Sequence, residues 1–372
     1  MSNKNNNKHV MEVIYSFDIG GSEMIAANLA KHFKKKGKSI SVCATHSGKG
    51  PISDILEMES IACFAMDCES YSRIKRRIML YKVFKKNKVD ILHVHHVSML
   101  ALCYYSAKLA GVKKIVVTEH NEINISLYPK LIKKAIRLCN KINYVTVIHN
   151  ELKKYFEDEI KVPSIKLKII PNGVNTNKYF PHLNTVKLRS SIGVNVDEVV
   201  IGCIGRLHEY KDHKNLIRAV SIIKKISNVS IKLLIIGDGY LRGELETFVE
   251  NENLHNIVQF LGERDDIDRL LNILDILVIS SSTEGLPMVL LEAMSSGVPC
   301  IATSVGGIPN VITKNCGILV SPENPDQLAN EIIYLAMNES MRKEMGRNAR
   351  QLVLDKYTDQ KMFKSYENIL FD

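Results

Sequence analysis

The chain has 372 residues and a net charge of +10, and 45% of its residues are hydrophobic and 24% are charged. Because a single hydrophobic core stops growing at about 250–300 residues, we expect two domains, and the average composition excludes a disordered or fibrous protein. The sequence lacks the ~18 apolar residues in a row that a membrane-spanning helix needs, and its polar start is unlike a secretory signal. We therefore expect a cytoplasmic protein whose scattered cysteines are reduced.

The charge is distributed unevenly along the chain. Residues 1–175 carry 29 basic and 15 acidic side chains, a net charge of +14, whereas residues 176–372 have a net charge of −4. The basic half is expected to meet an anionic partner, which composition leaves open as a phosphate-bearing substrate, nucleic acid or a membrane surface.

Apolar strand patterns alternate with helical patterns in the first half. A strand over 10–17 leads through Gly20-Gly21 into a helix over 22–36, and a second strand follows. We expect a mostly parallel, helix-covered sheet, with later strands at 39–44, 89–94, 114–118 and 143–148.

The pattern breaks at Ile170 to Gly173, and the polar segment 175–197 is the predicted linker. Alternation then restarts around a helix over 212–226, with strands at 198–204, 231–236, 256–261, 276–280, 298–303 and 317–320. Two open α/β sheets in one chain bind ligands at the carboxyl ends of their strands, so we expect a nucleotide in a cleft between the domains.

The densest chemical signal is the segment from Ser281 to Ala293. Pro287 favours a helix start, and the free amides from Met288 onward form a site for a phosphate. Glu284 and Glu292 can accept hydrogen bonds from sugar hydroxyls. The alternative is that Glu284 only complements the helix dipole and Glu292 is a solvated helix residue.

A second signal follows the strand at 198–204. Arg206 and Lys211 lie five residues apart in a loop that leads into a helix. Together they can neutralise a diphosphate without a metal ion, because arginine offers a planar fork and lysine a compact charge. The alternative is that both are ordinary solvated side chains.

These motifs and others in the same order resemble glycosyltransferase family 4, the retaining sugar-nucleotide transferases of the GT-B fold. The resemblance covers nearly the whole chain and rests on Gly20-Gly21-x-Glu23, Thr118-x-His120, Pro171-Asn172-Gly173-Val174, Gly205-Arg206-Leu207 with Lys211, Gly237-Asp238-Gly239, Phe260-Leu261-Gly262, Glu284-Gly285-Leu286-Pro287 to Glu292-Ala293, and Gly297-Val298-Pro299 with Gly306-Gly307.

The resemblance implies an α/β protein of the GT-B fold, with two Rossmann-like domains whose parallel sheets face a central cleft. Residues 1–175 would form the acceptor domain and residues 176–356 the nucleotide-sugar donor domain. The last helix, 357–370, would pack back on the first domain.

The resemblance also implies a role for each site residue. Glu284 would hold the donor sugar and Glu292 the ribose hydroxyls, while His120 would contact the sugar or the phosphate next to the reacting carbon. The donor diphosphate would lie among Gly20, Gly21, Arg206, Lys211, Gly285, Leu286, Met288 and Val289. Without the family, Gly20-Gly21 is a plain turn and His120 a hydrogen-bonded loop histidine.

The implied reaction moves a sugar, with retention, from a UDP- or GDP-sugar to a hydroxyl of a saccharide or lipid-linked glycan, in bacterial cell-surface polysaccharide biosynthesis. We expect no cofactor, no metal and no nucleic-acid partner. Two alternatives remain open: a sugar-nucleotide epimerase of the same fold, and a catalytically silent partner subunit that binds a nucleotide sugar.

Two features imitate metal sites. His93, His95 and His96 end a predicted strand, but no carboxylate or cysteine falls at ligand spacing nearby, so we expect them to line the cleft. The Asp-x-Asp at Asp266 to Asp268 resembles the metal motif of the other glycosyltransferase fold, and we interpret it as a helix start.

The segment 74–88 holds seven cations in fifteen residues, with apolar side chains at helical spacing, and 128–141 is similar. Such segments bind anionic lipid, which predicts a peripheral position on the inner face of the cell membrane. The alternative is an ordinary surface helix that covers the sheet.

Overall fold

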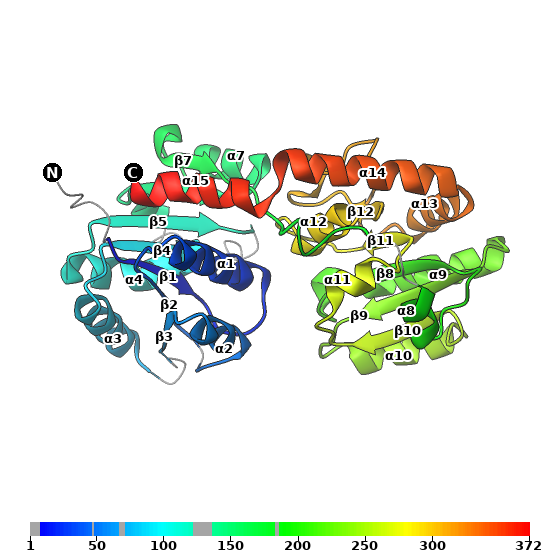
Figure 1. Ribbon diagram of the computed structural model, residues 1–372, viewed down its shortest axis with the longest axis horizontal. Helices are drawn as coiled ribbons and strands as arrows, with labels where there is room; N and C mark the ends of the chain where they lie inside the picture. Colours follow the sequence, from blue (N-terminus) through cyan, green and yellow to red (C-terminus); the bar gives the residue numbers. More distant parts are fainter. Residues whose placement is uncertain (1–7, 47, 67–70, 122–135, 183–185) are drawn as a thin grey trace. The chain divides into compact units, whose positions relative to one another are not determined.

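In a computed structural model, residues 8–46, 48–66, 71–121, 136–182 and 186–372 are described (Figure 1). They form two units. The first unit comprises Met1–Asn172 and Met362–Asp372, and the second comprises Gly173–Lys361.

The first unit contains a seven-stranded parallel sheet in the order β3-β2-β1-β4-β5-β6-β7. The strands are β1 Val10–Ile14, β2 Ile40–Ala44, β3 Ala62–Ala65, β4 Ile91–His95, β5 Lys114–Glu119, β6 Tyr144–Val147 and β7 Leu167–Ile169. The helices are α1 Gly21–Lys35, α2 Pro51–Met58, α3 Arg73–Lys86, α4 Val97–Ala110, α7 Asn150–Asp158 and α15 Asp359–Phe371.

Strands β1, β2 and β4 are buried along their whole length. Near-continuous apolar runs of this kind are typical of parallel strands with helices on both faces of the sheet. The strand order reverses at β1, which lies between β2 and β4. In sheets of this topology, ligands bind beside the carboxyl ends of the strands at the reversal point.

The second unit repeats this plan with six parallel strands in the order β10-β9-β8-β11-β12-β13, so its reversal point is β8. The strands are β8 Val199–Ile204, β9 Ile231–Ile236, β10 Val258–Gly262, β11 Ile276–Ile279, β12 Cys300–Thr303 and β13 Gly317–Val320. The helices are α8 Val186–Ser191, α9 His213–Ile226, α10 Arg242–Asn251, α11 Ile267–Leu271, α12 Met288–Ser295, α13 Pro325–Met337 and α14 Glu339–Lys356.

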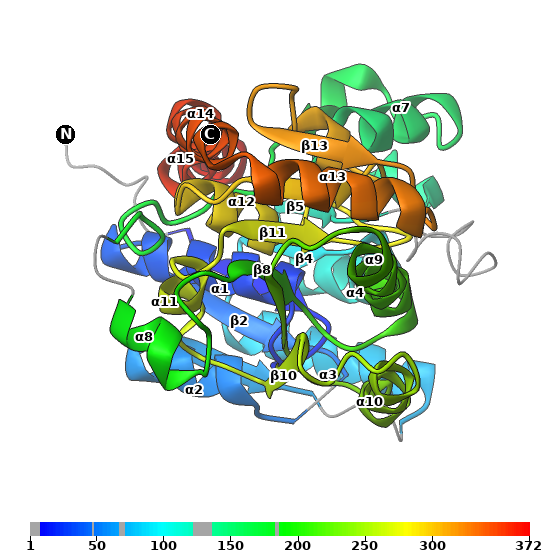
Figure 2. The ribbon, with the colours of Figure 1, turned by 90° about the vertical axis from the view of Figure 1, so that its right-hand side faces the viewer.

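Helices α9 and α13 pack against each other and share one apolar core with the strands of this sheet (Figure 2). Leu216 and Val220 of α9 and Ile332 of α13 are fully buried in that core. Among the described helices of both units, none is long and apolar enough to cross a bilayer.

The boundary between the units lies at Gly173, earlier than the expected residue 176, and the chain returns to the first unit at Met362. The cause is a parallel bridge between Val174 and Thr358, in which the Val174 amide donates to the Tyr357 carbonyl at 2.9 Å. This bridge places both segments in the second unit. Residues Met362–Asp372, which include most of α15, belong to the first unit, where Tyr366 is fully buried.

Candidate active site

The loop after β8 carries Arg206 and Lys211. Arg206 is exposed and forms no ion pair with the described residues, whereas Lys211 ends a short 3-10 helix, Glu209–Lys211. The neighbouring loop of Gly237 and Gly239 packs directly on this backbone, since a Cβ at either glycine would overlap the carbonyl oxygen of Gly205 or Leu207. The close contact fixes the path of the Arg206 loop.

Lys211 contacts the carboxylate of Glu284 from the loop after β11. The Lys211 Nζ lies 2.5 Å from Glu284 Oε1, and Ser281 Oγ donates to the same oxygen at 2.7 Å. Ser280 Oγ donates to the Lys211 carbonyl at 2.9 Å, which ties the two loops together. The structure thus brings together two residues that lie 73 positions apart. They line a small hollow with Cys203, Ile204, His213, Val278, Ile279, Ser280, Ser281 and Val289.

Helix α12 begins directly after this loop. Pro287 is its N-cap, one position earlier than the first helical turn in which the sequence placed it, and the helix proper starts at Met288. The first amides of a helix have no intrahelical acceptor, so those of Met288 and Val289 are available to an anion. Gly306, with φ +53°, packs directly on the loop that carries Glu284. A Cβ at Gly306 would overlap the Glu284 carbonyl oxygen.

Glu292 lies one helical turn further on and is hydrogen-bonded to Tyr179, a residue that the sequence analysis did not identify. Burial raises the pKa of Glu292 to about 7, against the lowering effect of the Tyr179 hydrogen bond and of Lys178. Ser295 Oγ holds the Tyr179 backbone by donating to its carbonyl at 2.5 Å. Tyr179 had no sequence signal, because it lies in the polar segment predicted to be a linker.

Gly20 and Gly21 stand at the start of α1, beside the carboxyl end of β1. Gly20 is the N-cap in an extended conformation, and neither glycine has a positive φ. A Cβ at Gly21 would meet nothing within 4 Å. Neither the backbone of Gly21 nor its packing therefore requires a glycine.

His120 follows β5 in the first unit and is almost fully buried. Its Nε2 lies 2.9 Å from His95 Nδ1, and His95 Nε2 lies 2.9 Å from Glu12 Oε2. His93 Nδ1 lies 2.7 Å from the same oxygen but is not aligned for a hydrogen bond. The expectation that His93 and His95 line a cleft without a carboxylate nearby is wrong, because both are fully buried against Glu12.

The Glu12 carboxylate could not be predicted from the residues around His93, because it lies on a different strand. Glu12 of β1 is the register partner of His93 of β4, 81 residues later. Burial raises the pKa of Glu12, but His93 and His95 outweigh it and lower the pKa to about 2. Burial and His93 lower the pKa of His95 to about 4, and burial with His96 and His95 lowers the pKa of His120 well below its ordinary value.

Glu12, His93 and His95 are also the one group among the described residues with the composition of a metal site. The separations of 2.7 and 2.9 Å from Glu12 Oε2 are those of direct contacts. Two ligands of one zinc ion, each about 2.0–2.2 Å from the metal in a tetrahedron, lie further apart than this. The geometry fits a carboxylate in direct contact with both imidazoles and hydrogen-bonded to His95, without a metal ion between them.

A second buried carboxylate, Glu119, holds the neighbouring turn. Glu119 accepts from His96 Nδ1 at 2.7 Å, from the His120 amide at 3.0 Å and from the Val97 amide at 2.9 Å. Burial lowers the pKa of His96, but Glu119 outweighs it and raises the pKa above its ordinary value. His96 Nε2 contacts Ser22 Oγ at 3.0 Å, which links this turn to the start of α1.

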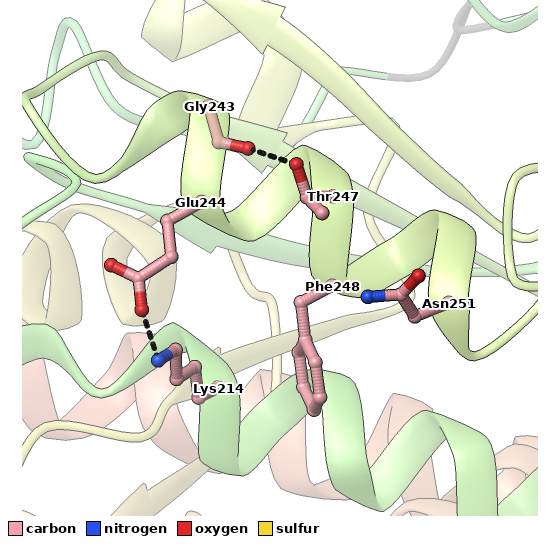
Figure 3. A pocket seen from close by; sticks show the side chains of 6 residues that line it. All are labelled: Lys214, Gly243, Glu244, Thr247, Phe248 and Asn251. Carbon is pink, nitrogen blue, oxygen red and sulfur yellow. Dashed lines mark hydrogen bonds and ion pairs between the residues drawn. The ribbon is translucent and has the colours of Figure 1, made fainter.

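A hollow of about 390 Å³ lies between α9 and α10 and is open to solvent (Figure 3). It is lined by Lys214, Gly243, Glu244, Thr247, Phe248 and Asn251, and Lys214 forms an ion pair with Glu244. None of the predicted site residues lines it, so we assign it no part in the chemistry.

Two open parallel sheets, each with glycine-rich or charged loops at its reversal point, are the architecture of GT-B glycosyltransferases. Solved structures of that class share this fold: the Anabaena protein HepE in complex with UDP matches with a TM-score of 0.85 at 20% identity, over 97% of this chain and 98% of that one. A glycosyltransferase from Rickettsia africae matches with a TM-score of 0.83 at 22% identity, over 98% and 99%. The expected GT-B fold is confirmed.

Residues 19–178 match the family described as Glycosyltransferase Family 4, and residues 185–352 match Glycosyl transferases group 1. The chain is 30% identical over 296 residues to a Bacillus anthracis N-acetyl-alpha-D-glucosaminyl L-malate synthase, covering 78% of this chain and 77% of the relative. It is 29% identical over 342 residues to an Escherichia coli UDP-Gal:alpha-D-GlcNAc-diphosphoundecaprenol alpha-1,3-galactosyltransferase, covering 87% of each. The chain belongs to glycosyltransferase family 4, and its activity is that of a glycosyltransferase.

Proposed function

We propose that this glycosyltransferase moves a sugar from a UDP- or GDP-sugar to a hydroxyl of a saccharide or lipid-linked glycan, with retention of anomeric configuration and without a metal ion. The observation that carries the proposal is the Lys211–Glu284 pair, which lies at the reversal point of the second sheet, next to the start of α12. A cation, a carboxylate and free helix amides together suit a diphosphate joined to a sugar.

The bond that breaks joins the anomeric carbon to the diphosphate, so negative charge develops on the leaving oxygen. Lys211 and the exposed Arg206 meet that charge, together with the first amides of α12. Glu284 accepts hydrogen bonds from the donor sugar. Glu284 pairs with Lys211, whose ammonium group is the partner that we propose for the donor diphosphate.

Metal independence follows from the same groups. Two cationic side chains and the positive end of a helix dipole supply the positive charge that a divalent cation provides in other nucleotide-sugar sites. For retention, the acceptor hydroxyl attacks the face from which the diphosphate departs. A carbon–oxygen bond forms to the acceptor as the bond to the diphosphate breaks, and a diphosphate oxygen takes the hydroxyl proton.

The names of relatives support the donor and acceptor classes. The Escherichia coli relative is named for UDP-Gal and a diphosphoundecaprenol acceptor, and a Campylobacter jejuni relative for a PP-undecaprenol acceptor. A Corynebacterium glutamicum relative is GDP-mannose-dependent and acts on a phosphatidylinositol mannoside. We therefore place the chain in bacterial cell-surface polysaccharide biosynthesis, with a lipid-linked acceptor.

Such an acceptor would bring the protein to the inner membrane surface, and α3 has a suitable surface. Ile74 and Ile78 of α3 are 72% and 49% exposed, while Leu80 and Phe84 are buried against the unit. Five cations of the same helix are exposed, namely Arg73, Lys75, Lys82, Lys85 and Lys86. The similar segment 128–141 falls mostly on residues outside those described. We propose that α3 contacts anionic lipid.

Thermal-shift measurements against UDP-, GDP- and ADP-sugars test the donor site. A ligand at 100 times its Kd stabilises the folded state by about 2.7 kcal/mol, which raises the unfolding temperature measurably. We expect UDP- or GDP-sugars to produce this shift in chelator-containing buffer, and Lys211→Ala to remove it. No shift with any sugar nucleotide would overturn the proposed donor site.

A further inference from the structure

A continuous chain of buried polar side chains ends at His120. It runs from Glu12 Oε2 to His95 Nε2, and from His95 Nδ1 to His120 Nε2, with both separations 2.9 Å. The three side chains come from the first unit alone, from β1, from β4 and from the residue after β5. Glu12 and His95 are fully buried, so neither makes contact with a substrate.

With Glu12 ionised and His95 neutral, the two hydrogen bonds define the position of each proton. An ionised carboxylate only accepts hydrogen bonds, so His95 must carry a proton on Nε2. His95 is fully buried, with its ring centroid 4.5 and 5.2 Å from those of His93 and His120, so a second proton on this ring is disfavoured and the ring is neutral. With its one proton on Nε2, His95 accepts a hydrogen bond at Nδ1 from His120 Nε2–H. The low pKa values of Glu12 and His95 agree with an ionised carboxylate and a neutral ring.

The other ring nitrogen, His120 Nδ1, makes no hydrogen bond with the described residues. In the tautomer set by His95, this nitrogen carries a lone pair. It can accept a hydrogen bond from a hydroxyl but cannot donate one to a phosphate oxygen.

We propose that Glu12 and His95 are positioning residues for glycosyl transfer, which hold His120 in the Nε2–H tautomer so that Nδ1 accepts a hydrogen bond from a sugar hydroxyl. The proposal rests on the proposed function and deepens it. Of the two contacts that the family resemblance leaves open for His120, the hydrogen-bond chain selects the sugar and excludes the phosphate.

A second arm of the network reaches the Glu12 carboxylate through His93, whose Nδ1 lies 2.7 Å from Glu12 Oε2. His93 Nε2 contacts Thr118 Oγ1 at 2.7 Å, and Thr118 Oγ1 contacts Thr146 Oγ1 at 2.5 Å and the Tyr366 hydroxyl of α15 at 3.2 Å. This arm is anchored in the same buried core but does not reach His120. It therefore supplies a matched control for the arm that does.

The ¹⁵N spectrum of the histidine rings tests the tautomer directly. We would label the whole wild-type chain with ¹⁵N-histidine and identify the His120 signals by their loss in His120→Gln. At pH 7 we expect a neutral ring with a protonated Nε2 and an unprotonated Nδ1. A ring protonated on Nδ1, whether neutral or cationic, would overturn the proposal.

Variants test the effect on the reaction. We expect His95→Leu to lower kcat by about 10- to 100-fold, by analogy with the hydrogen-bond partners that orient metal-ligating histidines. Its KM for the sugar nucleotide should change much less. His95→Asn keeps an acceptor near the Nδ1 position and should recover part of kcat. Thr146→Val, which removes a buried hydrogen bond from the other arm, should keep wild-type kcat.

Equal losses of kcat in His95→Leu and Thr146→Val, or wild-type kcat in His95→Leu, would overturn the proposal. If His95→Leu does not fold, the wild-type spectrum still decides the matter. Stoichiometric zinc in the purified protein, lost in Glu12→Gln, would also overturn it by making Glu12 a metal ligand. A protein with the expected tautomer but without transferase activity would instead contradict the proposed function.

Discussion

The ammonium group of Lys211 and the carboxylate of Glu284 lie 2.5 Å apart, on loops that follow two adjacent strands of the second sheet. Both side chains are largely shielded, with 28% and 11% of their surfaces exposed. In the proposed function, Lys211 would bind the diphosphate of the donor and the adjacent Glu284 would bind its sugar.

Removing either charge should therefore impair the reaction more than the fold. We expect Lys211→Ala and Glu284→Gln each to lower turnover by at least about 100-fold, because loss of one group that stabilises the transition state commonly costs 10²–10³ in rate. Lys214→Ala, which breaks the more exposed ion pair with Glu244, is the control and should remain active. Steady-state kinetics with circular dichroism measures both properties, and near-normal turnover in either site variant would remove its assigned role.

Gly21 permits a test that separates stability from function. An alanine there meets no neighbouring atom and occupies the first turn of α1, so Gly21→Ala should stabilise the protein by about 0.4–1 kcal/mol. Its Cβ would occupy the space proposed for the donor diphosphate, and the KM for the sugar nucleotide should rise at least tenfold. Gly243→Ala, in the first turn of α10 and equally open, should be stabilised without a change in KM. An unchanged KM in Gly21→Ala would place the diphosphate elsewhere.

The pKa of Glu292, raised by burial to about 7, predicts pH-dependent donor binding. In the role that the family resemblance implies, the ionised carboxylate of Glu292 would accept hydrogen bonds from two ribose hydroxyls, and its protonated form would accept fewer. Affinity for a sugar nucleotide should fall as the pH decreases from 8 to 6, and Glu292→Gln should abolish this dependence. Tyr179→Phe removes a hydrogen bond that lowers the pKa, so its midpoint should move to higher pH. Calorimetric titrations that give equal affinity at pH 6 and pH 8 would contradict this role.

The same pKa also predicts the stability of a variant. The pKa of Glu292 is about 7 in the folded state and has its ordinary value of 4.5 in the unfolded chain. Its contribution to folding is complete below pH 4.5 and is lost as the pH rises through 7. Glu292→Gln, which resembles the protonated form, should therefore have a higher Tm than the wild type at pH 8, but a similar Tm at pH 4.5. Differential scanning calorimetry at the two pH values measures this, and a lower Tm at pH 8 would contradict it.

The proposed membrane surface predicts salt-sensitive binding to anionic vesicles. Arg76 and Arg77 donate to backbone carbonyls within the unit, so the exposed cations of α3 are the better targets. We expect the triple variant Arg73→Gln, Lys82→Gln, Lys85→Gln to lose most of its sedimentation with phosphatidylglycerol vesicles, at roughly 1 kcal/mol per cation. Donor affinity should not change.

The control for this experiment removes equal charge from the other unit, through Lys187→Gln, Lys225→Gln and Lys356→Gln, and should still sediment. Binding should weaken as salt rises, because the Debye length falls to about 8 Å at physiological ionic strength. Wild-type protein that stays in the supernatant at low salt would refute the membrane surface.

The parallel sheets could be predicted from sequence because their central strands, such as β1, β4 and β11, are buried along their whole length and read as short apolar runs between turns. The edge strands β3 and β7 escaped, because their residues are partly exposed and their pattern is irregular. Helix α8 lies in the polar segment 175–197 and was not predicted. None of its residues is buried, so it has no apolar face that a sequence pattern could show. The edge strands β10 and β13 of the second sheet were predicted, so an edge position alone does not hide a strand.

The charged loops of the second unit were found because each carries its residues within a few positions of one another. Glu12 and Tyr179 were not found, since each acts on a residue far away in the sequence: Glu12 on His95, and Tyr179 on Glu292. Only the parallel register of β1 with β4, or the return of a polar segment onto α12, creates these contacts.

The most direct test of the account is transfer itself. The purified protein, in buffer with a chelator, would be given a UDP- or GDP-sugar selected by thermal shift and a lipid-diphosphate-linked saccharide, and the product's anomeric configuration would be determined by NMR. The account predicts acceptor-dependent release of the nucleoside diphosphate and a glycoside with the donor's anomeric configuration. Inverted configuration, or no acceptor-dependent release with any UDP- or GDP-sugar, would contradict it.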